Sequence, residues 1–303
     1  MLWLVITIFT YFILAFVFLV DKYLLTASIP NPKVYIFYVG TLGVLILILA
    51  PFVGFYVPEI KNIILCLAAG AIFIYALFWF YKTLKIFEAS RVVPVVGGLV
   101  PLFTLGLVYL FSFGEETLSF SKIIAFIFLV SGSIIIVLEK EKLINFKCFK
   151  NSLLTAILLS FSFVFTKYIF MLLPFWTALI WRSIGGFLMA ICFFVFFPEI
   201  KKEILEGKKT FSKKTTTIFL LNQTAGAGAG ILQSWAIALV PLAYLAFINA
   251  LQGIQYVFLL MLTVFLSLKF PQILKEEISK KILLQKIIAI LLIGGGLALF
   301  ALE

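Results

Sequence analysis

The stretch SKIIAFIFLVSGSIIIVLE, residues 121–139, decides how this chain is built, because it returns at residues 285–303 as QKIIAILLIGGGLALFALE. Lys122 opens the first copy and Lys286 opens the second. Each lysine is followed by Ile-Ile-Ala and by a long apolar run that ends in Leu-Glu. Self-similarity at a long period indicates a chain that contains copies of one structural unit.

Two earlier pairs of segments extend the duplication over most of the chain. FLVDKYLL at residues 18–25 matches FVFTKYIF at residues 163–170, and Pro58 and Pro198 are each followed by Glu-Ile-Lys. Proline lacks an amide hydrogen and restricts the residue before it, so both prolines predict the end of an apolar helix. The chain therefore consists of two corresponding halves.

The composition excludes a soluble globular protein. Hydrophobic residues make up 64% of the 303 residues and charged residues 12%, whereas soluble domains average about 45–50% and about 25%. We therefore expect one polytopic domain in a lipid bilayer rather than two soluble domains. The first apolar segment has no basic region before it and no small-residue cleavage site after it, so we expect it to be retained as a helix.

Ten segments are apolar enough to cross a bilayer, for which a helix needs about 20 residues. These segments are residues 2–20, 34–56, 62–81, 90–112, 120–138, 151–171, 175–197, 216–238, 243–268 and 284–301. Five fall in each half, residues 1–141 and 148–303, and an odd number forces the halves to cross in opposite senses. The sequence thus predicts an all-α polytopic membrane protein with ten transmembrane helices in two inverted five-helix repeats. Such repeats place a substrate site near the bilayer midplane.

The positive charges are distributed unevenly between the two sides. Loops after odd-numbered spans, with the adjoining span ends, hold 20 of the 24 Lys and Arg, loops after even-numbered spans hold 3, and Arg182 lies inside a span. Positive residues favour the cytoplasmic side, so this bias places both termini outside the cytoplasm. Loop lysines also explain the net charge of +11, so we expect no nucleic-acid partner. We expect a multi-pass protein of the cell (inner, cytoplasmic) membrane.

The residue types exclude several kinds of catalysis. Histidine is absent, which removes Ser-His-Asp and Cys-His catalysis and histidine-based metal sites. The three cysteines, Cys66, Cys148 and Cys192, are far apart and lack C-x-x-C spacing, so we expect neither a disulfide framework nor a metal cluster. We therefore expect no catalytic residue, no metal, no cofactor and no enzymatic activity.

Polar side chains inside apolar spans cost free energy, so their positions point to function. The fourth, eighth and ninth spans carry polar residues at helical spacing, on one face. Two interpretations stay open: a water-filled cavity between the halves, or structural hydrogen bonds between helices, worth about 0.6 kcal/mol each. We favour the cavity, because the stripes recur at corresponding places in both halves. The candidate substrate-binding residues are Trp79, Tyr81, Lys82, Glu88, Arg91, Arg182, Asn222, Gln233, Asn249, Gln252 and Tyr256.

Two charged candidates carry alternatives. Arg182 lies about two turns into its span and is either a substrate or gate contact, or a side chain that extends its charged head to the interface. Proton-coupled transport usually needs a carboxylate within the membrane. Near span ends the first half offers Asp21 and Glu88. We favour Glu88, for which the alternative is an ion pair with Lys85 or Arg91.

The residues described so far resemble the EamA family of the drug/metabolite transporter superfamily. The resemblance rests on Asp21-Lys22-Tyr23-Leu24-Leu25 at the end of the first span, Glu88-Ala89-Ser90 before the fourth span, and Pro101 within it. A short turn with Glu115 or Glu116 before the fifth span also resembles the family. The resemblance implies a ten-helix bundle with a central cavity that moves small metabolites or lipophilic compounds. It also implies cytoplasmic termini, which is opposite to the charge bias.

Together these observations predict a secondary transporter or exporter of small polar or amphipathic metabolites, such as amino-acid-like or other organic solutes, that works by alternating access. A flippase for a lipid-linked intermediate is the alternative, and lateral openings with a phosphate-binding arginine would favour it. A membrane-embedded transferase would need clustered acids or a histidine, which the chain does not offer. The substrate, the direction of transport, a coupling proton or ion, and a homodimer stay open.

Overall fold

The computed structural model describes residues 2–24, 31–87, 89–137, 146–205, 213–269 and 280–301, and every regular element in these ranges is helical. The elements are α1 (Leu2–Tyr23), α2 (Pro32–Gly43), η2 (Val44–Phe52), α3 (Ile60–Ile86), α4 (Ala89–Phe111), α5 (Phe120–Val137), α6 (Phe146–Leu172), α7 (Phe175–Phe196), α8 (Pro198–Leu205), α9 (Lys213–Leu239), η3 (Leu242–Tyr244), α10 (Leu245–Ala250), α11 (Gln252–Lys269) and α12 (Lys280–Ala301).

The protein is a helical membrane protein. Six described segments are long and apolar enough to cross a bilayer: Leu2–Asp21, Pro32–Phe52, Ile60–Ile86, Phe146–Leu172, Phe175–Phe196 and Leu242–Leu259. Three shorter apolar helices are Val95–Phe111, Phe120–Ile135 and Leu284–Phe300. The predicted span at 216–238 is also a helix, α9, but its amides, threonines and glycines lower its hydropathy.

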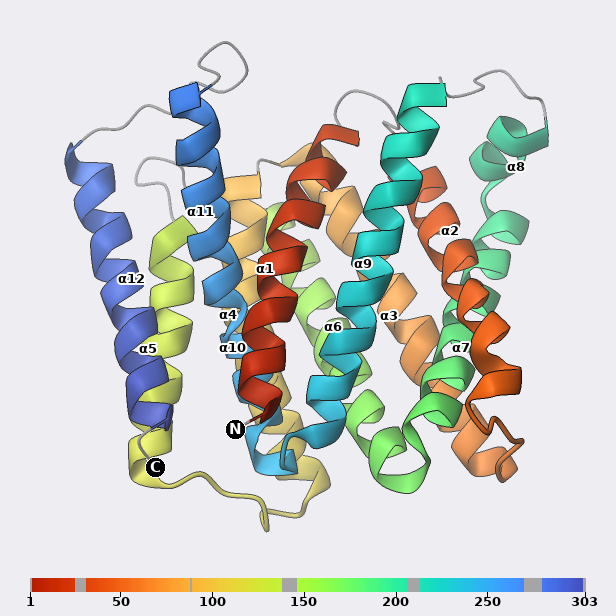
Figure 1. Cartoon of the computed structure of the whole chain (residues 1–303), viewed down its shortest axis with the longest axis horizontal. Helices are drawn as coiled ribbons and strands as arrows, with labels where there is room; N and C mark the ends of the chain where they lie inside the picture. Colours follow the sequence, from red (N-terminus) through yellow and green to blue (C-terminus); the bar gives the residue numbers. More distant parts are fainter. Residues whose placement is uncertain are drawn as a thin grey trace.

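The long helices stand side by side in one bundle, and consecutive ones run in opposite directions (Figure 1). Both chain termini lie at the same edge of the bundle, the lower one in Figure 1. The opposite edge holds the end of α1, the start of α9 and the short α8, with Lys33, Lys85, Lys201 and Lys213 among its basic residues. We call it the lysine-rich edge.

Two of the predicted spans are broken helices. The 3-10 helix η2 contains Pro51 and continues α2 toward the lower edge. The α-helix is not continued regularly here, because proline cannot donate the backbone hydrogen bond of a regular α-helix. The ninth span consists of η3, α10 and α11, with a turn at Leu251 between the last two. Interrupted helices are tolerated at membrane depth where protein surrounds them, and residues 245–251 are all buried.

Glycines set the closest helix contacts. A Cβ added at Gly70 on α3 would lie 1.8 Å from the carbonyl oxygen of Arg182 on α7, and one at Gly185 would lie 2.2 Å from that of Leu67. The duplicated helices α5 and α12 also pack on each other, and a Cβ at Gly296 would lie 2.9 Å from the carbonyl oxygen of Ala125. Small residues at such crossings are typical of helix packing in membranes.

Candidate functional site

A cluster of polar side chains around the half-buried carboxylate of Asp21 joins four helices near the lysine-rich edge. Asp21, in the last turn of α1, accepts a short hydrogen bond from the Tyr35 hydroxyl on α2. The same oxygen, Oδ1, accepts from Asn222 Nδ2 on α9 at 2.6 Å. The other oxygen, Oδ2, accepts from the Tyr81 hydroxyl on α3 at 3.3 Å. Gln223 Nε2 donates to the Tyr35 hydroxyl at 3.3 Å and extends the cluster. We call Asp21, Tyr35, Tyr81 and Asn222 the Asp21 cluster.

Local structure places these donors around Asp21. Asn31 caps the first turn of α2, where its side chain accepts from Lys33 N at 3.1 Å and Pro32 occupies an N-terminal position. Tyr35 follows one turn later and is fully buried. Its ring packs edge-on against Tyr81, with centroids 5.3 Å apart, and against Phe219 of α9, at 5.6 Å. The rings therefore fix the direction of the two hydroxyls.

Among the described side chains, neutral donors rather than a cation surround the Asp21 carboxylate. Among the side chains that the structure describes, the ion pairs within 4.0 Å are Lys33–Glu199 and Lys61–Glu59. Burying a carboxylate is costly unless its oxygens accept hydrogen bonds. Each hydrogen bond to a charged group contributes about 1.5–3 kcal/mol. The three donors therefore hold a negative charge at the junction of four helices.

A second group of polar side chains lies around Tyr11, ten residues before Asp21 on α1. At the rise of about 1.5 Å per residue in an α-helix, the two groups are about 15 Å apart along the helix axis. The Tyr11 hydroxyl donates to the carbonyl oxygen of Ile248 on α10 at 2.7 Å, and the Gln233 side chain of α9 bonds to the same hydroxyl. Tyr256 of α11 is only 6% exposed and its hydroxyl has no partner. A Cβ at Gly97 of α4 would lie 2.6 Å from that hydroxyl. The Tyr256 side chain therefore packs against α4 at Gly97, where a larger residue would leave no room for its hydroxyl.

Arg182 occupies a third place, at the crossing of α3 and α7. Its guanidinium carbon lies 4.9 Å from the centroid of the Phe73 ring. Its Nε is buried and has no hydrogen-bond partner among the described residues, and none of the described ion pairs involves the side chain. Cys66 is a further neighbour on α3. A guanidinium has five N–H donors, so this side chain retains unused capacity for an anion.

The remaining predicted residues fall elsewhere or outside the described set. Lys82 Nζ lies 4.3 Å from the centroid of the Trp79 ring, on the same helix, and Trp79 Nε1 is buried without a partner. Asn249 Nδ2 donates to Thr104 Oγ1 at 2.9 Å, which is a structural link between α10 and α4. Gln252 opens α11 and is half-buried. Glu88 and the side chain of Arg91 lie outside the described residues.

The predicted residues therefore do not form one site in this structure. Tyr81 and Asn222 meet at Asp21, while Gln233 and Tyr256 lie at the Tyr11 level. The sequence favours Glu88 over Asp21 as the carboxylate within the membrane, and it does not single out Tyr35. The available signal is that Asp21, an acidic residue, directly follows the first apolar span. The helical spacing of residues does not predict that Tyr35, on another helix, donates a hydrogen bond to Asp21.

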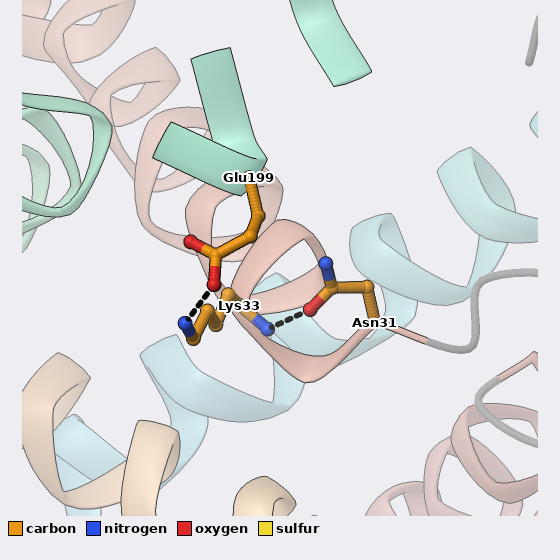
Figure 2. A network of polar contacts seen from close by, with 3 residues as sticks. All are labelled: Asn31, Lys33 and Glu199. Atoms are coloured by element: carbon orange, nitrogen blue, oxygen red, sulfur yellow. Dashed lines mark hydrogen bonds and ion pairs between the residues drawn. The ribbon is translucent and has the colours of Figure 1, made fainter. Parts of the chain in front are cut away.

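An ion pair lies outside the Asp21 cluster, at the rim of the lysine-rich edge. Lys33 Nζ of α2 lies 2.6 Å from Glu199 Oε1 of α8, and Figure 2 shows this pair with the Asn31 cap. Lys33 Nζ also lies 4.5 Å from the centroid of the Phe197 ring. The hydrogen bond from Lys33 holds the pKa of Glu199 below its ordinary value. The first and second halves are thus joined at the surface as well as in the interior.

Comparison with known proteins supports the fold alone. No protein-family profile and no curated protein sequence matches the chain. Solved structures do match, and one of them, described only as the crystal structure of a protein, covers 98% of this chain and 96% of its own. The TM-score is 0.67 and the sequence identity is 15%. At this identity the similarity indicates a shared fold over nearly the whole chain and carries no activity.

Proposed function

We propose that the protein is a secondary transporter or exporter of small polar or amphipathic metabolites, of the EamA type, that works by alternating access. The observation that carries the proposal is the row of polar contacts between α1 of the first half and α9 of the second. Asp21 meets Asn222 at one level, and Tyr11 meets Gln233 at the other. Polar groups that face one another within a membrane bundle are expensive, and they commonly mark a pathway for solutes.

The arrangement of neighbours supports two inverted five-helix repeats. If α1 corresponds to α6 and α3 to α9, the pair α1–α9 becomes the pair α6–α3, and both pairs are in contact. The pairs α5–α12 and α2–α7 each join corresponding helices, and both are in contact too. The path of the chain agrees, because α1 runs toward the lysine-rich edge whereas α6 runs away from it (Figure 1).

A flippase for a lipid-linked intermediate is the second candidate, and Arg182 is the observation that favours it. A guanidinium with unused donors in an aromatic surrounding fits a phosphate group, which it binds in a bidentate manner. The same guanidinium fits the carboxylate of a small solute. The size of the molecule that carries the anion therefore distinguishes the two functions.

Reconstitution into liposomes tests both candidates. Uptake of radiolabelled amino acids and other organic acids and amines would be compared between proteoliposomes and protein-free liposomes. Transbilayer movement of a fluorescent isoprenoid phosphate would be followed in parallel, with quenching from outside. Faster solute uptake with protein, and unchanged lipid movement, is the expected result. Equal rates with and without protein across both panels would contradict the proposal.

A further inference from the structure

The Asp21 cluster has the components of a proton-operated latch at one edge of the bundle. Oδ1 accepts from two donors, Tyr35 and Asn222, whereas Oδ2 accepts from Tyr81 alone, at 3.3 Å. The less occupied oxygen is therefore the one open to a proton. Tyr23, two residues further along α1, is exposed, so the surface of the bundle lies within one helical turn of the carboxylate.

Among the residues that the structure describes, the titratable groups bonded to Asp21 are the Tyr35 hydroxyl from α2 and the Tyr81 hydroxyl from α3. From α9 it meets Asn222, which does not titrate. Among the side chains of α11 that the structure describes, none is charged. The charge of the described cluster therefore changes when the carboxylate gains or loses its proton.

The second half lacks this device at the corresponding position. Thr166 stands where the duplication places Asp21 in the first half, and its hydroxyl donates to Ser162 O of its own helix at 2.6 Å. The neighbouring Lys167 Nζ donates to Ala238 O, near the C-terminal end of α9, at 3.1 Å. The carboxylate nearest to this place is that of Glu116, which comes from the turn between α4 and α5 and acts on Lys167 through its charge.

We propose that protonation of Asp21 releases the contact between α1 and α9 and opens the lysine-rich edge, so that a proton is the coupling ion. The proton binds to Oδ2 and converts the carboxylate to a carboxylic acid, whose Oδ1 is a neutral acceptor. Hydrogen bonds to a neutral acceptor have about half the strength of those to a charged one. Both donors to Oδ1, one on α2 and one on α9, therefore lose strength together. The role of the proton as coupling ion rests on the proposed transport function, whereas the opening of the edge on protonation does not.

Two measurements test the latch without a substrate. Dicyclohexylcarbodiimide adds to protonated carboxyl groups in apolar surroundings, and mass spectrometry of the adduct reports the protonation of Asp21. We expect the Asp21 adduct to form at low pH and to disappear as the pH rises. Tyr35→Phe removes a donor that favours the carboxylate, so the midpoint of labelling should rise by about one pH unit. Tyr38→Phe is the matched control, since its ring also packs on Phe219, with centroids 6.0 Å apart.

The opening itself is measured as a distance between spin labels at Lys85→Cys on α3 and Thr216→Cys on α9. Both positions are exposed at the lysine-rich edge, and the exposed Cys192 is replaced by serine in this background. We expect a longer distance at low pH in the wild-type cluster. Asp21→Asn, the neutral mimic, should show the long distance at every pH.

Either of two results overturns the latch: an Asp21 adduct that does not depend on pH, or a distance that changes with pH equally in the Asp21→Asn variant. If Asp21→Asn does not fold, Tyr35→Phe and Tyr81→Phe take its place, and an unchanged distance profile in both overturns the latch. A failed transport panel with a pH-dependent adduct and distance would refute the proposed function and leave the latch in place.

Discussion

Asn222 on α9 donates to Asp21 on α1 across 2.6 Å, although 201 residues separate them in sequence. The bond crosses between the two halves of the chain, and it ends on an oxygen that Tyr35 also contacts. A carboxylate that keeps several neutral donors in place fixes the mutual position of their helices. The junction of α1, α2, α3 and α9 therefore depends on one ionised side chain.

Replacement of Asn222 by leucine should destabilise the bundle in a pH-dependent manner. The change keeps the size of the side chain and removes one hydrogen bond to a charged group, which contributes about 1.5–3 kcal/mol. The midpoint of thermal unfolding in detergent should therefore fall at neutral pH and fall less at low pH, where Asp21 is protonated. Gln223→Leu is the control, because Gln223 bonds to the Tyr35 hydroxyl rather than to the carboxylate. An equal loss in both variants would contradict the special role of Asp21.

Apolar patterning predicts the helices better than it predicts their ends. Nine of the ten expected segments are long runs of hydrophobic residues, and a helix lies in each of them. The tenth expected segment, residues 216–238, contains amides and glycines, and it too is a helix, α9. The break in the ninth span was not predicted, because no proline falls between Leu245 and Gln252. Leu251 leaves the regular helix where the surrounding helices enclose it completely, and such a tertiary effect has no local sequence signal.

The candidate site was predicted only in part, for a similar reason. The sequence singles out polar residues inside spans, and two of these, Tyr81 and Asn222, donate to the carboxylate of Asp21. A polar residue inside a span need not line a substrate site. Asn249 is an example, because its bond to Thr104 links two helices. Helical spacing shows which residues share a face, but the rotation of that face depends on the packing of its neighbours. Asp21 and Tyr35 come from different helices, so spacing alone could not pair them.

Substitution of Gly70 by alanine should disrupt the crossing of α3 and α7. The new methyl group would lie 1.8 Å from the Arg182 carbonyl oxygen, and backbone atoms cannot move aside as a flexible side chain does. Overpacking of this kind costs about 1–3 kcal/mol, occasionally more. The matched variant is Gly228→Ala, where nothing lies within 4 Å of the added Cβ. Thermal unfolding in detergent should show a large loss for the first variant and none for the second. A similar loss in both would contradict the close approach.

Replacement of Arg182 by methionine should leave stability unchanged or improve it, while it impairs handling of an anionic ligand. The guanidinium contacts the Phe73 ring at 4.9 Å and takes part in none of the described ion pairs. A cation–π contact contributes about 0.5–1 kcal/mol, whereas insertion of an arginine at mid-helix costs about 2.5–3.5 kcal/mol. Thermal unfolding and liposome uptake would be measured together, with Ser183→Ala as control, since that hydroxyl bonds within its own helix. A marked loss of stability would indicate a structural role for Arg182.

The surface pair Lys33–Glu199 should contribute little, and only above acidic pH. The bond from Lys33 lowers the pKa of Glu199, so its stabilisation is present above the ordinary glutamate value of about 4.3 and is lost as the pH falls through the lowered value. Glu199 is half-exposed, and such pairs contribute about 0–1 kcal/mol. Glu199→Gln should therefore lower the unfolding midpoint slightly at pH 7 and leave it unchanged once the pH lies below the lowered pKa of Glu199. A loss as large as that of Asn222→Leu would contradict this ranking.

The lysine-rich edge should face the cytoplasm. Of the 24 Lys and Arg, 20 belong to loops and span ends after odd-numbered spans. The described ends of α1, α3 and α11, which precede three of these loops, lie at the edge opposite the termini (Figure 1). Because positive loops are retained on the cytoplasmic side, a membrane-impermeant maleimide added to intact cells should label Glu115→Cys and not Thr216→Cys. Both residues are exposed, at opposite edges, and Cys192→Ser removes the exposed native thiol. Opening the cells should make both cysteines reactive. Labelling of Thr216→Cys in intact cells, without Glu115→Cys, would reverse the orientation and place the termini and the Asp21 latch on the other sides of the membrane.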